Sequence, residues 1–201
     1  GFEEYKKQHI PNSIFFDLDE NSKKDTKLPH MLVQEEDWNN IVSKMGINNT
    51  DKVVIYDNSD VISSCRLWFN LIYFGHNAKL VHVLNGGFQK WLSENKRVTD
   101  QVSYTDNSNY KSLEKKELVK DKIMIDKNLD VQDFKIIDAR SKDRFHGKIP
   151  EPREGLRSGS IKNSFCIPFN TCLNKDRTFK KKSDLEKIFK EYLEDLKEKN
   201  I

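Results

Sequence analysis

Long apolar runs are absent from this sequence of 201 residues. No stretch approaches the roughly 18 consecutive apolar residues that a membrane-spanning helix needs. The first residues also lack the basic region and the following apolar region that together mark a secretory signal. We therefore expect neither a membrane span nor a signal peptide in these residues, and no membrane partner.

Cysteine is scarce as well. The chain has three, Cys65, Cys166 and Cys172, which cannot all pair with one another and show no C-x-x-C spacing. This pattern disfavours both a disulfide framework and a cysteine-based zinc site. We expect a reducing, cytoplasmic setting and no bound metal.

Arginine is also scarce, with 7 arginines against 28 lysines. Four of the seven lie within 18 residues, at Arg140, Arg144, Arg153 and Arg157. A guanidinium group binds carboxylates and similar anions through two parallel hydrogen bonds, which an ammonium group cannot do. The clustering therefore indicates a place in the chain where two-point binding matters.

The overall charge gives no indication of a nucleic-acid partner. The chain has 35 cationic and 32 anionic residues, a net charge of +3, with the two signs mixed along most of its length. Its one basic run, residues 180–182, precedes Ser183 and Glu186, which have the spacing of a capping box. We interpret this run as the solvated start of a helix over residues 184–196, which ends with Leu196 on its apolar face.

Apolar periodicity in the first half predicts strands and helices in alternation. The predicted elements are helices over residues 34–45, 66–74 and 88–92, with Ser63 or Ser64 as a helix cap, and strands over residues 52–56 and 80–84. This order indicates the α/β class, in which helices cover a parallel sheet. A polar stretch, residues 97–113, is interpreted as part of an interdomain linker, and a further strand is predicted over residues 133–138.

An internal repeat suggests how the chain is divided. Residues 9–13 (HIPNS), followed by three apolar residues, recur 151 positions later as residues 160–164 (SIKNS). Chance similarity over so few positions is the alternative. A true repeat predicts a first domain over residues 1–96, a linker over residues 97–118 and the first part of a second domain over residues 119–201. The two copies overlap incompletely, so we expect the first to lack its initial strand and the second to lack the loop after its central strand.

Taken in order, these motifs resemble the tandem-domain rhodanese-like sulfurtransferases, and among them the 3-mercaptopyruvate and thiosulfate sulfurtransferases. The matching segments are residues 9–13 (HIPNS), 15–19 (FFDLD), 28–32 (LPHML), 66–69 (RLWF), 84–88 (LNGGF), 138–141 (DARS) and 150–155 (PEPREG). The resemblance implies two rhodanese-like domains, each a parallel sheet flanked by helices and both incomplete in this chain. Only the second would be catalytic.

The resemblance also implies a reaction. A cysteine thiolate takes sulfane sulfur from a small anionic donor, becomes a persulfide, and passes the sulfur to cyanide or to a thiol acceptor such as thioredoxin or glutathione, without a metal or an organic cofactor. By the family pattern this cysteine would follow Ile201, so we expect it to be absent from these residues. Asp57 stands at the equivalent position of the inert copy. The three cysteines that are present are interpreted as packing residues.

Arg144 and Arg153 match the two arginines that hold the donor's carboxylate and carbonyl in mercaptopyruvate-type members. The alternative is that they are surface arginines paired to Asp143, Glu151 or Glu154. Because thiosulfate-preferring relatives usually lack an arginine at the position of Arg153, its presence favours 3-mercaptopyruvate. Arg140 and Arg157 are interpreted as structural.

Asp19 and His30 match an Asp–His pair to which a catalytic role has been assigned in mercaptopyruvate enzymes. A carboxylate that orients an imidazole would help to protonate the leaving enolate. The alternative is that His30 only satisfies backbone groups. For the whole protein the alternatives are an inert rhodanese-like module that binds proteins or anions, and a related cysteine-dependent phosphatase.

Overall fold

A computed structural model describes residues 1–59 and 62–193. The chain forms two compact units, Gly1–Val119 and Lys120–Ile201, which are taken separately below. In the described part of the chain, no helix combines the length and apolar character needed to cross a membrane.

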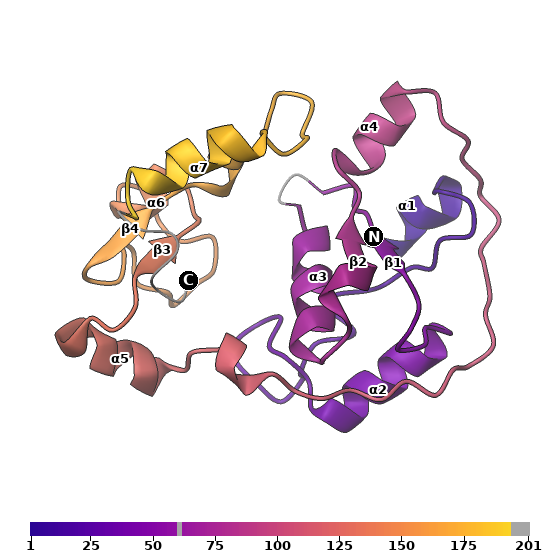
Figure 1. Ribbon diagram of the computed structural model, residues 1–201, viewed down its shortest axis with the longest axis horizontal. Helices are drawn as coiled ribbons and strands as arrows, with labels where there is room; N and C mark the ends of the chain where they lie inside the picture. Colours follow the sequence, from indigo (N-terminus) through magenta and orange to yellow (C-terminus); the bar gives the residue numbers. More distant parts are fainter. Residues whose placement is uncertain (60–61, 194–201) are drawn as a thin grey trace. The chain divides into compact units, whose positions relative to one another are not determined.

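The first unit contains a small parallel sheet. Its elements are α1 (Phe2–Lys7), α2 (Glu35–Lys44), β1 (Val53–Ile55), α3 (Ser64–Tyr73), the 3-10 turn Ala78–Leu80, β2 (Val81–Val83), α4 (Gly87–Ser93) and the 3-10 turn Lys116–Leu118. β1 and β2 pair in parallel, with Val53 opposite Val81. Helix α3 connects the two strands and packs against both (Figure 1). The predicted α/β class is confirmed in this unit.

The core of the first unit is aromatic. Trp38 of α2 is fully buried and stacks on Phe74, with 4.7 Å between the ring centroids, and Tyr73 meets Phe74 edge to face at 4.9 Å. Val42, Ile55, Leu71 and Val81 complete the buried cluster together with Tyr110. This packing joins α2, α3 and both strands, because each contributes the apolar side that its periodicity predicted.

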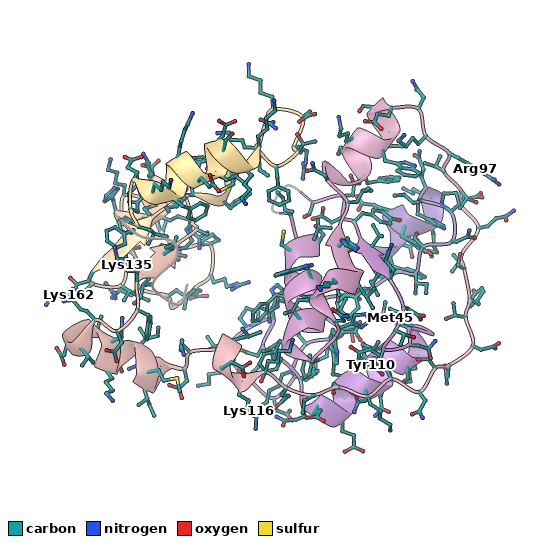
Figure 2. All side chains as sticks on the ribbon, viewed as in Figure 1. Met45, Arg97, Tyr110, Lys116, Lys135 and Lys162 are labelled. Atoms are coloured by element: carbon teal, nitrogen blue, oxygen red, sulfur yellow. The ribbon has the colours of Figure 1, made fainter. Side chains whose placement is uncertain are left out.

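Residues 97–118, interpreted above as a linker, are part of the first unit and pack against its other elements. Thr99 pairs in antiparallel fashion with His9 through two backbone hydrogen bonds of 2.8 and 2.9 Å. Tyr110 is 1% exposed, its hydroxyl lies 3.1 Å from Nδ1 of His76, and burial raises the pKa of Tyr110 to about 12. Figure 2 shows the segment running from Arg97 past Tyr110 to Lys116. The apolar core of the first unit thus includes a residue from this polar stretch.

The second unit contains another pair of parallel strands. Its elements are α5 (Lys122–Val131), β3 (Ile136–Asp138), α6 (Lys142–Phe145), β4 (Ser164–Cys166), the 3-10 turn Phe169–Cys172 and α7 (Lys182–Lys190). Ile136 lies opposite Ser164. β3 begins later than predicted because the side chain of Asn128 bonds both backbone groups of Phe134, at 3.0 Å to its N–H and 2.9 Å to its carbonyl.

The predicted capping box of the last helix is wrong. Helix α7 begins at Lys182, with Lys181 as the N-cap, and the carbonyl of Lys181 accepts from the N–H groups of Asp184 and Leu185 at 2.9 and 3.0 Å. Ser183 therefore lies in the first turn and does not cap it. The predicted continuation to Leu196 lies outside the described residues.

The two repeated sequences form the same turn. Asn12 and Asn163, 151 residues apart, both have left-handed backbones, with φ values of 62° and 63°. In each copy the serine that follows donates its N–H to the isoleucine three residues back: Ser13 to Ile10 at 3.1 Å and Ser164 to Ile161 at 3.2 Å. Asparagine suits this position because it tolerates a positive φ better than most residues with a side chain.

Candidate functional site

Arg144 lies on α6, the short helix that follows β3, and forms an ion pair with Glu151. Its Nη2 donates to Oε2 of Glu151 at 2.5 Å, and its Nε donates to Oε1 of the same residue at 3.3 Å. The N–H of Arg144 is in turn capped by the hydroxyl of Ser141. The contact that the sequence analysis named as the alternative, a pair with Glu151, is therefore present.

Arg140 links Asp138, Glu151 and the carbonyl of Gly159 through hydrogen bonds. Its Nη1 donates to Oε1 of Glu151 at 2.7 Å, its Nη2 donates to the carbonyl of Gly159 at 2.8 Å, and its Nε lies 3.0 Å from both oxygens of Asp138. The hydrogen bonds from Arg140 lower the pKa of Asp138. Those from Arg144, and then the charges of both arginines, lower the pKa of Glu151. Both carboxylates are thereby held in the ionised form.

Arg153 differs from both. It is exposed, in a loop of exposed residues, and it has no hydrogen bond or ion pair with any residue that the structure describes. Arg157, four residues on, is also exposed but donates to the carbonyls of Ser158 and Ser160 at 3.3 and 3.2 Å. Arg153 is therefore available to an anion from solution.

The structure brings Asp19 and His30 together in the first unit. Nε2 of His30 lies 2.6 Å from Oδ1 of Asp19, and both side chains reach solvent. His30 has a left-handed backbone, with a φ of 58°, and Arg66 of α3 holds its carbonyl through Nη2. Arg66 is itself fixed by Asn70 one turn later, whose Oδ1 accepts from Nε at 2.9 Å. The pair therefore has the geometry in which a carboxylate orients an imidazole.

Asp57, at the end of β1, occupies the start of the loop that leads into α3. Its Oδ2 accepts from the hydroxyls of Ser59 and Ser63, at 2.6 and 3.0 Å, and from the backbone N–H of Ser64 at 3.2 Å. Asp57 therefore caps α3, in place of the serine side chains that the sequence analysis considered. The loop thus holds a built-in anion at the N-terminus of α3.

Asp57 is also held by the first turn of α4. Its carbonyl accepts from the N–H of Phe88 at 3.0 Å, and Gly87 has a φ of 58°. A Cβ on Gly87 would lie 2.9 Å from the carbonyl oxygen of Asp57, so only glycine fits there. The glycine pair after β2 thus allows close approach to the Asp57 loop.

None of the three cysteines is disulfide-bonded. Burial, and then the charge of Asp57, raise the pKa of the Cys65 thiol at the start of α3. Burial and the charge of Asp138 raise the pKa of Cys166 in β4. A raised thiol pKa is the opposite of what a nucleophile requires. For Cys65 and Cys166, these surroundings fit the packing role predicted from the sequence.

Cys65 and Cys166 are expected to react more slowly with iodoacetamide than free cysteine does. Only the thiolate reacts, and a raised pKa leaves less of it near neutral pH, so alkylation should accelerate only above the ordinary thiol pKa of about 8.5. Mass spectrometry of alkylated peptides from about pH 7 to about pH 10 measures this. Asp57→Asn removes a like charge and should speed alkylation of Cys65 but not of Cys166. Alkylation of either thiol faster than free cysteine near pH 7 would contradict the assignment.

Two contributors escaped the sequence analysis. Arg66 holds the carbonyl of His30 and is itself held by Asn70, and the spacing of four residues between Arg66 and Asn70 on one helix face is the signal that would have found the pair. Glu151 entered only as a candidate partner for surface arginines. Its place between Arg140 and Arg144 depends on how the loop after α6 folds back.

Within residues 1–59 and 62–193, no group of three or more metal-binding side chains is placed to hold an ion.

Comparison with known proteins shows what this chain is similar to. The rhodanese-like domain matches residues 1–94. SseA of Escherichia coli, a 3-mercaptopyruvate sulfotransferase of known crystal structure, superposes with a TM-score of 0.82 at 26% identity, covering 94% of this chain and 69% of SseA. Residues 1–94 therefore match the rhodanese-like domain, and the fold of the chain is similar to that of SseA.

The curated relatives to which the chain is similar are sulfurtransferases. The chain is 33% identical over 195 residues to the 3-mercaptopyruvate sulfurtransferase of Mus musculus, covering 96% of this chain and 65% of the mouse protein. It is 36% identical over 208 residues to the mitochondrial thiosulfate/3-mercaptopyruvate sulfurtransferase 1 of Arabidopsis thaliana, covering 93% of this chain and 54% of the plant protein. The chain thus spans less than two thirds of the length of these curated relatives.

Proposed function

We propose that the full-length gene product is a sulfurtransferase that moves sulfur from a small anionic donor to a thiol or to cyanide. The observation that carries this proposal is the contrast between two nearby arginines, in a chain related to sulfurtransferases along most of its length. Arg144 is anchored to a buried carboxylate, and Arg153 is exposed without an ion pair among the described residues. An anchored and an open guanidinium suit a donor with a carboxylate and a carbonyl.

The proposed donor is 3-mercaptopyruvate, with thiosulfate as a second substrate. A cysteine thiolate attacks the donor's sulfur, the bond between sulfur and carbon breaks, and its electron pair leaves as pyruvate enolate, which takes up a proton. Cyanide or an acceptor thiolate, from thioredoxin or glutathione, then attacks the outer sulfur of the persulfide and releases the cysteine thiolate. Arg144 and Arg153 bind the donor, and the Asp19–His30 pair is the proposed proton donor.

We further propose that the two units are copies of one fold, with the first inert. The shared turn at Asn12 and Asn163 supports a tandem arrangement. The carboxylate of Asp57, already satisfied within its own loop, supports the inertness of the first copy. The surroundings of Cys65 and Cys166 favour a nucleophile other than these residues. Three free cysteines also support a reducing compartment, for which we propose the cytoplasm.

A sulfur-transfer assay tests the proposal. The full-length gene product is expected to form thiocyanate from cyanide with 3-mercaptopyruvate and, less efficiently, with thiosulfate. The polypeptide of residues 1–201 alone is expected to be inactive, because the proposed nucleophile is none of its three cysteines. Failure of the full-length product with both donors would favour the inert binding module, and hydrolysis of aryl phosphates instead would favour the phosphatase.

A further inference from the structure

Glu151 is a buried carboxylate with an arginine on each oxygen. Its side chain is 4% exposed, Oε1 accepts from Arg140 at 2.7 Å, and Oε2 accepts from Arg144 at 2.5 Å. An ionised carboxylate withdrawn from water is strongly destabilising unless it is paired and hydrogen-bonded. Here both requirements are met by two guanidinium groups. Glu151 therefore cannot move without leaving at least one of them unpaired.

One of these arginines is immobile for an independent reason. Arg140 is bound to Asp138 at the end of β3 and to the carbonyl of Gly159, in addition to Glu151. Its hydrogen bonds with Asp138 raise the pKa of Arg140. Asp138 at the end of β3 thus fixes Arg140, Arg140 fixes Glu151, and Glu151 fixes Arg144.

Arg144 is held by one edge only. The contacts to Glu151 use Nε and Nη2, and Nη1 has no hydrogen-bond partner within residues 1–59 and 62–193. A guanidinium has five N–H donors in a planar fork. The opposite edge, made of Nη1 and the remaining N–H of Nη2, is therefore in a fixed orientation and free to bind a carboxylate through two parallel hydrogen bonds.

We propose that Glu151 is a positioning residue that makes the site selective for donors with a carboxylate. It fixes the free edge of Arg144, and its negative charge offsets that of the guanidinium. Attraction by charge alone is thereby weakened, and a planar carboxylate that matches the free edge is favoured over thiosulfate, which cannot use that geometry equally well. This inference rests on the proposed function and names the residue that sets its substrate preference.

The test is Glu151→Gln in the full-length gene product, with both donors. Glutamine accepts through one oxygen but turns its amide N–H groups toward the other arginine, so Arg144 loses its anchor. We expect KM for 3-mercaptopyruvate to rise about fivefold to tenfold, with kcat changed less than about twofold, because the variant must order Arg144 on binding. KM for thiosulfate should stay the same or fall, since a negative charge has been removed.

The matched control is Glu154→Gln, which removes an exposed acid three residues away that has no partner among the described residues. It should change neither KM. A general structural role for Glu151 would raise both KM values together or lower only stability. Equal changes for the two donors, or no change for either, would overturn the proposal.

A second measurement separates this inference from the proposed function. In the ¹⁵N-labelled full-length protein, the Nε–H signal of Arg144 should show restricted motion in the wild type and in Glu154→Gln, and free motion in Glu151→Gln. This readout needs no turnover. An immobile Arg144 in Glu151→Gln would overturn the positioning role even if the enzyme is active. Loss of order in that variant, together with an inactive wild type, would support the anchor and contradict the sulfurtransferase.

Discussion

Replacing Arg153 with alanine is expected to raise KM for 3-mercaptopyruvate by roughly 10- to 100-fold in the full-length gene product. Hydrogen bonds to charged groups contribute about 1.5–3 kcal/mol, and each 1.4 kcal/mol corresponds to a factor of ten. Arg153 has no competing partner among the described residues, so its N–H groups are free for the donor. Steady-state kinetics with cyanide as the acceptor measure the change.

Two companion variants define what Arg153 contributes. Arg153→Lys keeps the charge but loses the planar fork, so it should recover only part of the lost affinity for 3-mercaptopyruvate. Arg157→Ala removes an exposed arginine four residues away, whose hydrogen bonds go to the carbonyls of Ser158 and Ser160. It should leave KM near the wild-type value. If Arg157→Ala and Arg153→Ala raised KM equally, the loop would contribute only general positive charge.

Wild-type KM for 3-mercaptopyruvate in Arg153→Ala would remove this residue from the donor site. The similarity to the rhodanese-like domain and to the curated sulfurtransferases would stand, because it does not depend on Arg153. The preference for 3-mercaptopyruvate over thiosulfate would then have lost its support, since the sequence analysis based that preference on Arg153.

The helices α2, α3 and α4 and both strands of the first unit could be predicted from the sequence because their signals are local, whereas α1 was not predicted. β1 lies within the predicted strand 52–56, and β2 lies within the predicted strand 80–84. The observed strands are shorter than predicted because backbone groups at their ends form hydrogen bonds outside the sheet. The N–H of Leu80, for example, bonds the carbonyl of Asn77 in a 3-10 turn. Apolar periodicity locates an element, whereas its ends depend on such individual contacts.

The path of residues 97–118 could not be predicted in the same way. The stretch is polar and has no period, which is typical of a linker, yet Tyr110 inserts into the core and its N–H bonds the hydroxyl of Ser43 at 3.0 Å. A single aromatic residue gives no periodicity. Only the space left by α2 and α3 makes its burial favourable.

For the candidate site, composition predicted which segment of the chain holds the clustered arginines, but not the different contacts that each arginine makes. The concentration of arginines pointed to residues 140–157, and three of them have different surroundings. Arg140 is fully engaged, Arg144 is held by one edge, and Arg153 is free of ion pairs among the described residues. What separates them is the position of Glu151, a tertiary contact that spacing along the chain does not determine.

Replacing Trp38 with alanine is expected to destabilise the first unit by about 3–5 kcal/mol, the usual cost of deleting a large buried aromatic side chain. Trp38 is fully buried, stacks on Phe74 at 4.7 Å and meets Phe16 at 6.2 Å. Its removal leaves a cavity between α2 and the residue that ends α3. Urea unfolding followed by hydrogen exchange of peptides from β1 and β2 measures the first unit separately from the second.

Two variants distinguish packing from other effects. Nε1 of Trp38 is buried and has no hydrogen-bond partner among the residues that the structure describes, so Trp38→Phe keeps most of the ring and removes an unsatisfied donor. It should cost much less than Trp38→Ala. Trp68→Ala removes a partly exposed tryptophan from α3 and should cost well under half as much. Equal losses for Trp38→Ala and Trp68→Ala would mean that the stack of Trp38 on Phe74 is not the centre of this core.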